Sequence, residues 1–321
     1  MAGETTWSYD APTGTFKNHW LSSKLLHVAV EKMKFVPMTE PIKGFGKRMG
    51  ETVTIPHIKR LSEPTSAQLS EDTKIPIDKL EFGTRSLTLV EWGRGVEYTH
   101  LLELLSKYDI RNEVQRALVD QMEASMDTAA AGAFTGTDVK VVFIPTSLTS
   151  GQFDTDGTPS TSATHNLTFD HMGVISDYMA GDLHVPFYEA DNYVGMFARK
   201  ALRGLKQDPL WQNINMYLRK GEMFFKGEVG MAENIRCIQV NRENALSNSI
   251  GTNNILGQSV VFGAEAVARI EAEAPHLRLD PNYQSDFGRT AAAAWYGVVQ
   301  FGSFWNTAND GEAKIVRIDS A

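Results

Sequence analysis

The sequence contains little or none of several features that usually direct the search for a function. Cys237 is the only cysteine among 321 residues, which excludes an intrachain disulfide and a multi-cysteine metal site. A lone cysteine in an apolar context is typical of a small buried side chain in a strand. No apolar run approaches the roughly 18 residues of a membrane span, so we expect no transmembrane helix.

An excess of charge of one sign is also missing. The chain has 31 Lys and Arg residues against 39 Asp and Glu residues, a net charge of -8 with no basic run. This balance argues against tight, salt-dependent duplex binding through a basic face. The first segment, MAGETTWSYDAPTGTF, lacks the basic flank and apolar core of a secretory signal. We therefore expect a soluble protein made in a cytoplasm.

Catalytic motifs are absent as well. There is no G-x-S-x-G, no H-E-x-x-H and no Cys/His nucleophile pattern. The glycines of GFGKRMG, residues 44–50, follow no strand with dinucleotide-motif spacing, so they predict a hinge and not a phosphate site. Asp154-x-Asp156-Gly157 begins like a calcium loop but lacks the later acids and the closing glutamate.

The histidines give no stronger signal for a metal. His165 and His171 are six residues apart, so they do not share a helical face, and surface or capping roles are favoured. We therefore predict no catalytic, cofactor-binding or metal-binding residues, no cofactor and no enzymatic activity. An αβ enzyme with an unrecognised site in residues 165–285 stays open as an alternative.

The longest regular pattern runs from Thr99 to Phe134 and contains no proline. Its apolar residues recur at three- and four-residue steps, as on one helix face: Leu101, Leu104, Leu105, Tyr108, Val114, Leu118, Met122, Met126 and Ala129. Thr99 is a plausible N-cap, and Gly132 and Gly136 mark the end. The pattern predicts one spine helix of about 35 residues, roughly 52 Å long at 1.5 Å per residue.

Residues 50–98, just before this helix, predict a long β-hairpin. ETVTIPHIKRL forms its outgoing strand and LEFGTRSLTLVEWGRGVEY its returning strand, with a polar connection that contains Pro64 and Pro76. A two-stranded ribbon of this length is marginal in isolation. We therefore expect it to pack on another surface, in its own chain or in a neighbouring copy.

The first 36 residues predict an extended arm that packs on something else, because four large aromatic residues precede any periodic element. They are Trp7, Tyr9, Phe16 and Trp20. A short helix from Leu21 to about Lys34 follows. Its apolar residues are Leu25, Leu26, Val28, Ala29 and Met33.

The rest of the chain alternates strands and helices and indicates an α+β fold. Strands are predicted at 139–144, 193–197, 221–230, 234–240, 258–262, 290–305 and 312–318, and helices at 168–183, 198–205 and 264–274. Thr168 is the expected cap of the first of these helices. Asn309-Asp310-Gly311 predicts a tight turn between the last two strands.

The order of these parts resembles the major capsid proteins of tailed bacteriophages, which have the Hong Kong 97 (HK-97)-like fold. Within that fold the sequence is most similar to the N-four-type capsid family. The resemblance rests on TVTIPHIKRLSEPT (52–65), LSEDTKIPIDKLEF (69–82), the Thr99–Phe134 helix and GEVGMAENIRCIQV (227–240).

The resemblance implies an α+β, HK-97-like fold in four parts. These are an N-terminal arm (1–36), an extended loop (50–98), a peripheral domain (99–164 with 286–321) and an inserted axial domain (165–285). It also implies a subunit that self-assembles as hexamers and pentamers into an icosahedral shell around double-stranded DNA. The implied partners are other copies of the chain, a separate scaffolding protein, a portal and optional decoration proteins, with no membrane.

The implied location is the virion, after assembly in the cytoplasm of the bacterial host. A nanocompartment shell of the encapsulin type, which encloses an enzyme and no DNA, is the alternative within the same fold. The predicted intersubunit contacts lie on the arm and the extended loop: Trp7, Tyr9, Phe16, Trp20, His57, Lys59, Arg60, Glu63, Glu71, Asp72, Lys74 and Lys79. Residues between Lys206 and Gly221 are expected near the capsomer axes.

Overall fold

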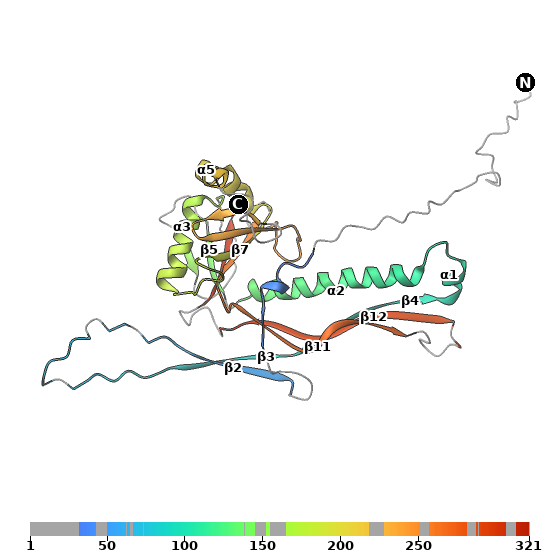
Figure 1. Ribbon diagram of the computed structural model, residues 1–321, viewed down its shortest axis with the longest axis horizontal. Coiled ribbons are helices and arrows are strands. Elements are labelled where there is room, and N and C mark those ends of the chain that lie inside the picture. Colours follow the sequence, from blue (N-terminus) through green and yellow to red (C-terminus); the bar gives the residue numbers. More distant parts are fainter. Residues whose placement is uncertain are drawn as a thin grey trace, which may run out of the picture.

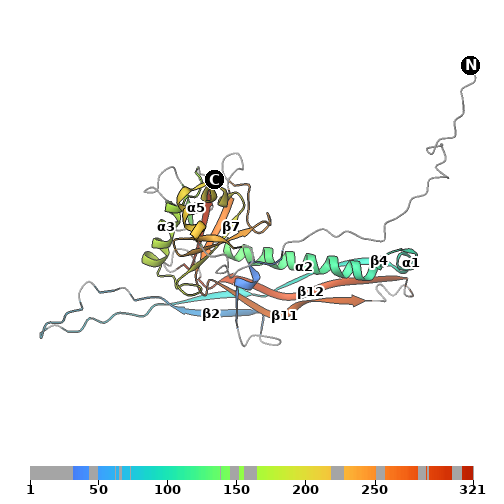
Figure 2. The same cartoon turned by 45° about the horizontal axis from the view of Figure 1, so that its top comes forward.

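Three separate β-sheets organise the part of the chain that the structure describes, as Figure 1 shows for the computed structural model of the protein. The structure describes residues 32–42, 50–61, 63–64, 67–72, 74–137, 139–144, 152–154, 165–217, 228–250, 257–280, 287, 289–305 and 313–320. A rounded module stands above one end of a long helix, a twisted sheet runs below that helix, and a narrow ribbon projects beyond the module (Figures 1 and 2).

The rounded module is built on a seven-stranded sheet with the order β6-β5-β13-β10-β7-β9-β8. Its strands are β5 (Lys140–Phe143), β6 (Gln152–Asp154), β7 (Tyr193–Ala198), β8 (Glu228–Ala232), β9 (Ile235–Val240), β10 (Gly257–Phe262) and β13 (Ile315–Ser320). Its helices are α3 (Phe169–Asp177), a π-helical turn (Tyr178–Asp182), α4 (Ala201–Gln207) and α5 (Pro209–Tyr217). Strands such as β7 are buried along their whole length, because both faces of the sheet are covered.

The lower sheet has four strands in the order β1-β11-β12-β4. These are β1 (Glu40–Pro41), β4 (Val90–Thr99), β11 (Val267–Asp280) and β12 (Thr290–Ser303), and a short 3-10 turn, η1 (Val36–Met38), precedes β1. The long helix α2 (Ile110–Phe134) lies along this sheet and buries Trp295, Val299 and Phe301 of β12 in a shared core.

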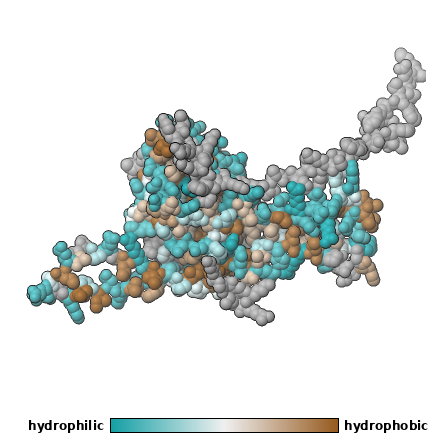
Figure 3. Space-filling model, in the orientation of Figure 1, coloured by the Kyte–Doolittle hydropathy of each residue, from teal (hydrophilic) through white to brown (hydrophobic). Residues whose placement is uncertain are grey.

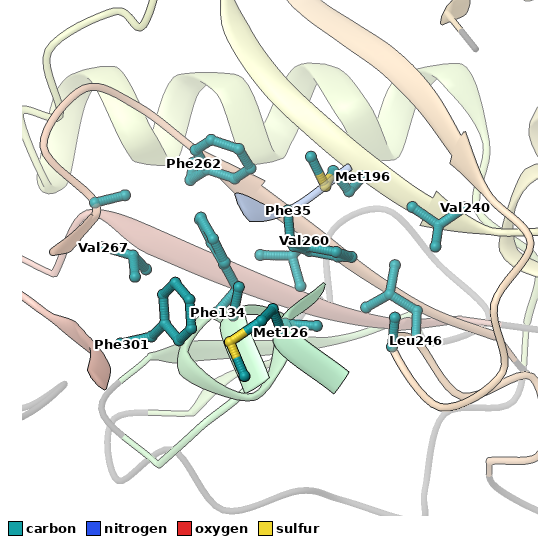
Figure 4. Close-up of a cluster of buried hydrophobic side chains, with 14 of the residues drawn as sticks. Phe35, Met126, Phe134, Met196, Val240, Leu246, Val260, Phe262, Val267 and Phe301 are labelled. Atoms are coloured by element: carbon teal, nitrogen blue, oxygen red, sulfur yellow. The ribbon is translucent and has the colours of Figure 1, made fainter. Parts of the chain in front are cut away.

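One hydrophobic core joins the end of α2 to both sheets, as the close-up in Figure 4 shows. The ring centroid of Phe134 on α2 is 5.5 Å from that of Phe35 and 4.6 Å from that of Phe262 on β10. All three rings are fully buried. This aromatic contact fixes the module on the end of the helix, because interior side chains pack at crystal-like density.

The predicted spine helix is divided, which corrects the prediction of one continuous helix over Thr99–Phe134. A short helix α1 (His100–Leu105) and α2 are separated by Ser106–Asp109. Thr99 caps α1 as expected, since its hydroxyl accepts from the Leu102 N–H at 3.3 Å. The Asp109 carboxylate accepts from the Asn112 N–H at 3.2 Å and starts a second helix, because aspartate favours caps over helix interiors.

The predicted hairpin is real but shorter than expected. β2 (Thr52–Ile58) pairs with β3 (Phe82–Thr88), so the ribbon is antiparallel as predicted. The chain leaves the ribbon at Leu89, and β4 pairs with β12 instead. The hairpin therefore ends near residue 89 and not at 98, because the backbone groups of β4 find partners in the lower sheet.

The prediction of a helix at 264–274 is wrong. Residues 267–280 form β11, which pairs with β12 over most of its length and has register shifts between Glu271 and His276. Ala and Glu favour helices locally, but fourteen strand residues beside β12 outweigh that preference. Pro275 lies at the irregular part, where the ladder does not need its missing N–H.

The sheets also divide the chain differently from the predicted domain bounds. β5 and β13 complete the seven-stranded sheet of the module, whereas β11 belongs to the lower sheet. The module thus includes 140–143 and 315–320 and excludes 267–280. β12 and β13 do not pair with each other, and the predicted turn at Asn309–Gly311 lies outside the described residues.

Other predictions are confirmed. Cys237 is fully buried in β9. Thr168 and His171 form a capping box at the start of α3, as expected for a capping histidine. The predicted helix at Leu21–Lys34 lies almost wholly outside the described residues, and Lys32–Lys34 are not helical.

Candidate interaction surfaces

The base of the ribbon is fastened to its own chain. Leu87 of β3 is buried and packs with Ala268 and Ile270 of β11. Its side chain lies so close to Gly302 of β12 that a Cβ there would overlap it. The His57 ring meets the Trp305 ring edge-on, with centroids 4.2 Å apart. The predicted contact residue His57 is therefore placed at the root of the ribbon, against its own chain.

The predicted charged residues of the loop lie farther out. Lys59 Nζ is 3.7 Å from a Glu81 carboxylate oxygen, and Arg60 Nη2 is 3.1 Å from Glu63 Oε1. Exposed pairs of this kind contribute little to the stability of a chain. Four further predicted contact residues, all exposed, follow toward the tip and return: Glu71, Asp72, Lys74 and Lys79.

The tip also exposes apolar side chains that were not among the predicted contacts. Ile77 is 87% and Ile75 67% exposed, and Phe82, farther back at the start of β3, is 68% exposed. Figure 3 shows hydrophobic residues along the projecting ribbon, between hydrophilic ones. The signal that sequence reasoning missed is IPI at 75–77, where two isoleucines flank a proline in a polar connection. Contiguous exposed apolar side chains mark an interaction surface.

A second apolar surface lies at the opposite end of the long axis, around α1 (Figures 1 and 3). The helix α1 buries no residue, and its four leucines are exposed: Leu101, Leu102, Leu104 and Leu105. Leu105 is 77% exposed. A cavity beside it is lined in part by polar side chains, those of His100, Glu103, Arg111 and Asp280. Adjacent exposed leucines of this kind make α1 a candidate contact surface for another molecule.

A buried carboxylate joins the three parts of the body. Asp127 of α2 is 2% exposed, and its Oδ1 accepts from the N–H groups of Lys34 and Phe35, both at 2.8 Å. Arg242, in the loop after β9, approaches Asp127 Oδ2 at 3.4 Å and donates to the Ala124 carbonyl at 3.2 Å. The contacts bind the segment before η1, the spine helix and the module to one another. Buried charges persist when they are paired and hydrogen-bonded in this way.

Three ionisable groups of the module, those of His171, Cys237 and Asp319, have pKa values that are shifted by burial. Burial lowers the pKa of His171, whose Nδ1 accepts from the Thr168 N–H at 3.2 Å. Burial raises the pKa of the Cys237 thiol well above its usual range. Burial also raises the pKa of Asp319 to about 6, although the nearby Arg317 guanidinium opposes the shift. Asp319 is 1% exposed and lies next to the last residue of β13, a strand that is buried along its whole length.

Within the described residues no group of three or more His, Cys, Asp or Glu side chains is placed to hold a metal ion. Three cavities, of about 320, 250 and 150 Å³, are lined by α2 and strands of the lower sheet and ribbon, away from the module. The geometry thus brings together no set of groups with a recognisable catalytic arrangement among the residues described. Trp7, Tyr9, Phe16 and Trp20 lie outside them.

Comparison with known proteins gives a consistent answer at the level of structure alone. No protein-family model and no curated protein matches the sequence. The fold is similar to the cyanophage Pam1 capsid asymmetric unit, with a TM-score of 0.74, 14% identity and coverage of 98% of this chain and 99% of that one.

Two further capsids match over nearly their whole length. The acid-stable capsid of Helicobacter pylori bacteriophage KHP30 has a TM-score of 0.70 and 12% identity, covering 99% of both chains. The capsid of Ralstonia phage GP4 has a TM-score of 0.67 and 15% identity, covering 98% of this chain and 97% of that one. These matches do not test the N-four-type resemblance, which stays a prediction.

The long helix over a sheet, the projecting ribbon and the mixed module occur together, and they match phage capsid structures over almost the entire chain. The predicted fold class is confirmed: the chain has the α+β, HK-97-like fold of tailed-phage capsids.

Proposed function

We propose that the protein is a major capsid protein, a structural subunit that self-assembles as hexamers and pentamers into the icosahedral shell of a tailed phage. The observation that carries the proposal is the exposure of apolar side chains at both ends of an elongated molecule. The ribbon tip and α1 each leave large side chains in water, with Ile77 87% and Leu105 77% exposed. Burial against neighbouring copies removes that surface from water.

The ribbon tip and α1 lie at opposite ends of the elongated molecule, so they do not cover each other (Figure 1). A contact between unlike ends of two copies is heterologous, and repetition of such a contact closes into a ring when the rotation permits. Rings of five and six copies are what the proposed shell requires. The whole-length similarity to phage capsids supports this function over an enzyme of the same size.

The proposal includes partners beyond the chain itself. Double-stranded DNA is enclosed without sequence recognition, which suits a chain with a net charge of -8. A separate scaffolding protein, a portal and optional decoration proteins complete the particle, which assembles in the bacterial cytoplasm and becomes part of the virion. No helix in the described part of the chain is long and apolar enough to cross a membrane.

The test is electron microscopy of the purified chain, produced with and without the scaffolding protein of its genomic neighbourhood. We expect closed icosahedral particles or five- and six-fold rings. A chain that stays monomeric under both conditions contradicts the proposal. Nuclease treatment then separates the two shell types, because a virion protects double-stranded DNA and an encapsulin-type nanocompartment encloses a protein cargo instead.

A further inference from the structure

The charges of the module are separated by sign along the chain. No Lys or Arg occurs between Lys140 and Arg199, although Asp and Glu recur through this stretch. Basic residues then follow closely, with no acid among them: Arg199, Lys200, Arg203 and Lys206. Solvated surfaces usually intersperse the two signs. The separation therefore directs attention to the surfaces on which these side chains lie.

One acidic surface lies on the exposed side of α3. Asp170 and Asp177 are two helical turns apart, so they share the side that points away from the module core. A Cβ at Gly173 of the same helix would lie 3.5 Å from the Glu233 side chain, which adds a third exposed carboxylate. Val174, 38% exposed, lies on this side as well. Asp170, Asp177 and Glu233 around Val174 form what we call the acidic face.

A basic surface lies on α4 and the residues just before it. Arg199 and Arg203 are four residues apart, and both side chains are exposed. Lys206, in the last turn of α4, is also exposed, and its Nζ donates to the neutral Gln239 Oε1 at 2.9 Å. Arg199, Arg203 and Lys206 form what we call the basic face.

The basic face is bordered by exposed apolar side chains of α5. The Gln212 side chain of α5 donates from Nε2 to the Lys206 carbonyl at 2.8 Å, so the two helices lie together. Leu210 and Ile214, one turn apart on α5, are 51% and 41% exposed. In Figure 1 α5 stands at the top of the module, whereas α3 stands on its flank. The two faces therefore lie on different parts of the module surface.

Neither face finds its counter-charge within the described part of the chain. The ion pairs of this region use other residues: Arg236 with Glu189 at 3.5 Å, and Lys314 with Glu265 at 2.7 Å. Like charges held side by side destabilise a folded chain. The fold of one copy thus gains nothing from gathering each sign on its own surface, and a partner of opposite sign offsets the repulsion.

We propose that the acidic face of one module binds the basic face of a second copy of this chain, with Val174 seated against Leu210 and Ile214. Each face has exposed apolar side chains beside its charges, as protein interfaces do. A nucleic acid would match the basic face alone, whereas a second copy matches both faces in sign.

Such a contact is heterologous, because it joins unlike surfaces of two copies. A pair of copies joined in this way still has one free face of each sign, so a third copy can bind at either end. The inference deepens the proposed self-assembly and rests on it. Its failure remains distinguishable, because other surfaces can hold a shell together.

Charge reversal of each face tests the contact. The basic face is reversed by Arg199→Glu with Arg203→Glu, and the acidic face by Asp177→Lys with Glu233→Lys. We expect each variant to need at least about a tenfold higher protein concentration to self-associate, because like charges then meet across the contact. Sedimentation at low salt measures the association. The matched control, Arg199→Lys with Arg203→Lys, keeps the charge and should associate like the unchanged chain.

The two reversals should compensate each other. A chain that carries both has its signs exchanged, so we expect it to self-associate again. A mixture of the two singly reversed chains should also associate, because each copy of one kind then binds copies of the other kind. Alternation around a closed ring requires an even number of copies. The mixture is therefore expected to form hexamers but neither pentamers nor closed shells, which electron microscopy distinguishes.

Three results overturn the contact. Equal association of the unchanged and the singly reversed chains overturns it and leaves the capsid proposal standing. A chain with both reversals that stays dissociated overturns it as well, because the two faces then meet other partners. Loss of DNA binding on reversal of the basic face, with self-association unchanged, assigns that face to nucleic acid instead. An unchanged chain that never associates contradicts the capsid proposal together with the contact.

Engineered cysteines cover the case in which a reversed chain does not fold. Cys237 is fully buried and leaves no reactive background. Val174→Cys with Leu210→Cys should oxidise to a ladder of covalent oligomers on a non-reducing gel, because each contact brings together one cysteine from each of two copies. The matched pair Phe187→Cys with Leu210→Cys should stay monomeric. Equal ladders from the two pairs, or no ladder from the first, contradict the contact.

Discussion

The module and the two ends of the molecule use apolar residues in opposite ways. In the module Tyr193, Val194 and Phe197 of β7 are fully buried. Val194 packs in the core that contains α2, whereas Tyr193 and Phe197 pack in the core that contains α3 and α4. On the ribbon tip Ile75 and Ile77 are among the most exposed large apolar side chains described. The same residue types stabilise a single chain in one region and are available for association in the other. The contrast separates the residues that the fold needs from those that the proposed shell needs.

The largest effect is expected from removing the ribbon tip. Replacement of residues 62–80 by a two-residue turn deletes the exposed isoleucines Ile75 and Ile77 but leaves the paired strands β2 and β3 intact. We expect complete loss of shells, because the neighbouring copy loses its contact, while the chain still unfolds cooperatively near the temperature of the unchanged protein. Electron microscopy and calorimetry measure the two results.

The control keeps the original length of residues 62–80 and leaves the isoleucines in place, and only the order of its polar residues is scrambled. Shells that persist after the deletion contradict the role given to the ribbon. A folded body that no longer unfolds cooperatively contradicts the separation of the two regions.

Truncation of one side chain in each region sharpens the comparison. Phe262→Ala in the core should cost about 3–5 kcal/mol in the free energy of unfolding, because it removes a ring packed against Phe134 and leaves a cavity. Ile77→Ala should change the free energy of unfolding by less than about 0.5 kcal/mol. The yield of assembled particles should nevertheless fall for Ile77→Ala. Urea titration and sedimentation measure the two quantities, and an equal loss of stability in both variants contradicts the contrast.

The junction between the regions depends on Asp127. Asp127→Ala leaves the Lys34 and Phe35 N–H groups and the Arg242 guanidinium without their buried acceptor. We expect a loss of about 3 kcal/mol in the free energy of unfolding, since breaking a buried pair leaves an uncompensated charge. Arg60→Ala, which removes an exposed pair with Glu63, is the control and should cost less than about 1 kcal/mol. A similar small loss in both variants contradicts the role of Asp127.

The smallest effect concerns pH. The folded-state pKa of Asp319 is raised from 3.8 to about 6, so between these values the folded chain binds more protons than the unfolded chain. Stability from this group is therefore full below about pH 4 and is lost as pH rises through 6. Between pH 5 and pH 8 the loss amounts to about 1.4 kcal/mol.

Asp319→Asn removes this titration. We expect the free energy of unfolding of the unchanged protein to fall by about 1.4 kcal/mol more than that of the variant between pH 5 and pH 8. Urea titrations at the two pH values give the difference. Parallel pH profiles for the two proteins contradict the shifted carboxyl group.

Local signals in the sequence predicted the elements that depend on neighbours along the chain. Thr99 and Thr168 cap helices where expected, because a cap needs only a side chain and the next three residues. The ribbon strands alternate as predicted, and Cys237 is buried in its strand. For the proposed interaction surface, the sequence predicted the charged loop residues, which stays a prediction, but not the exposed isoleucines, because exposure depends on which parts of the chain fail to cover a side chain.

Errors occurred where distant partners decide the outcome. Residues 264–274 have the composition of a helix, yet residues 267–280 form a strand that pairs with β12. Residues 90–98 continue the apparent hairpin, yet they pair with the same strand β12 from its other side. Both errors have one cause: β12 offers two open edges, and the pairing of backbone groups across a sheet outweighs a local preference of a few tenths of a kcal/mol per residue.

The sequence by itself determined the order of ribbon, long helix and mixed module, because the signals for them, periodicity, caps and proline positions, are local to each stretch of the chain. Only the tertiary structure decided which sheet each strand joins, where the spine helix divides and which apolar residues stay in water. Those outcomes depend on contacts such as Asp127 with Phe35, between residues 92 positions apart. Such contacts form only when the whole chain is folded, so they leave no local pattern to find.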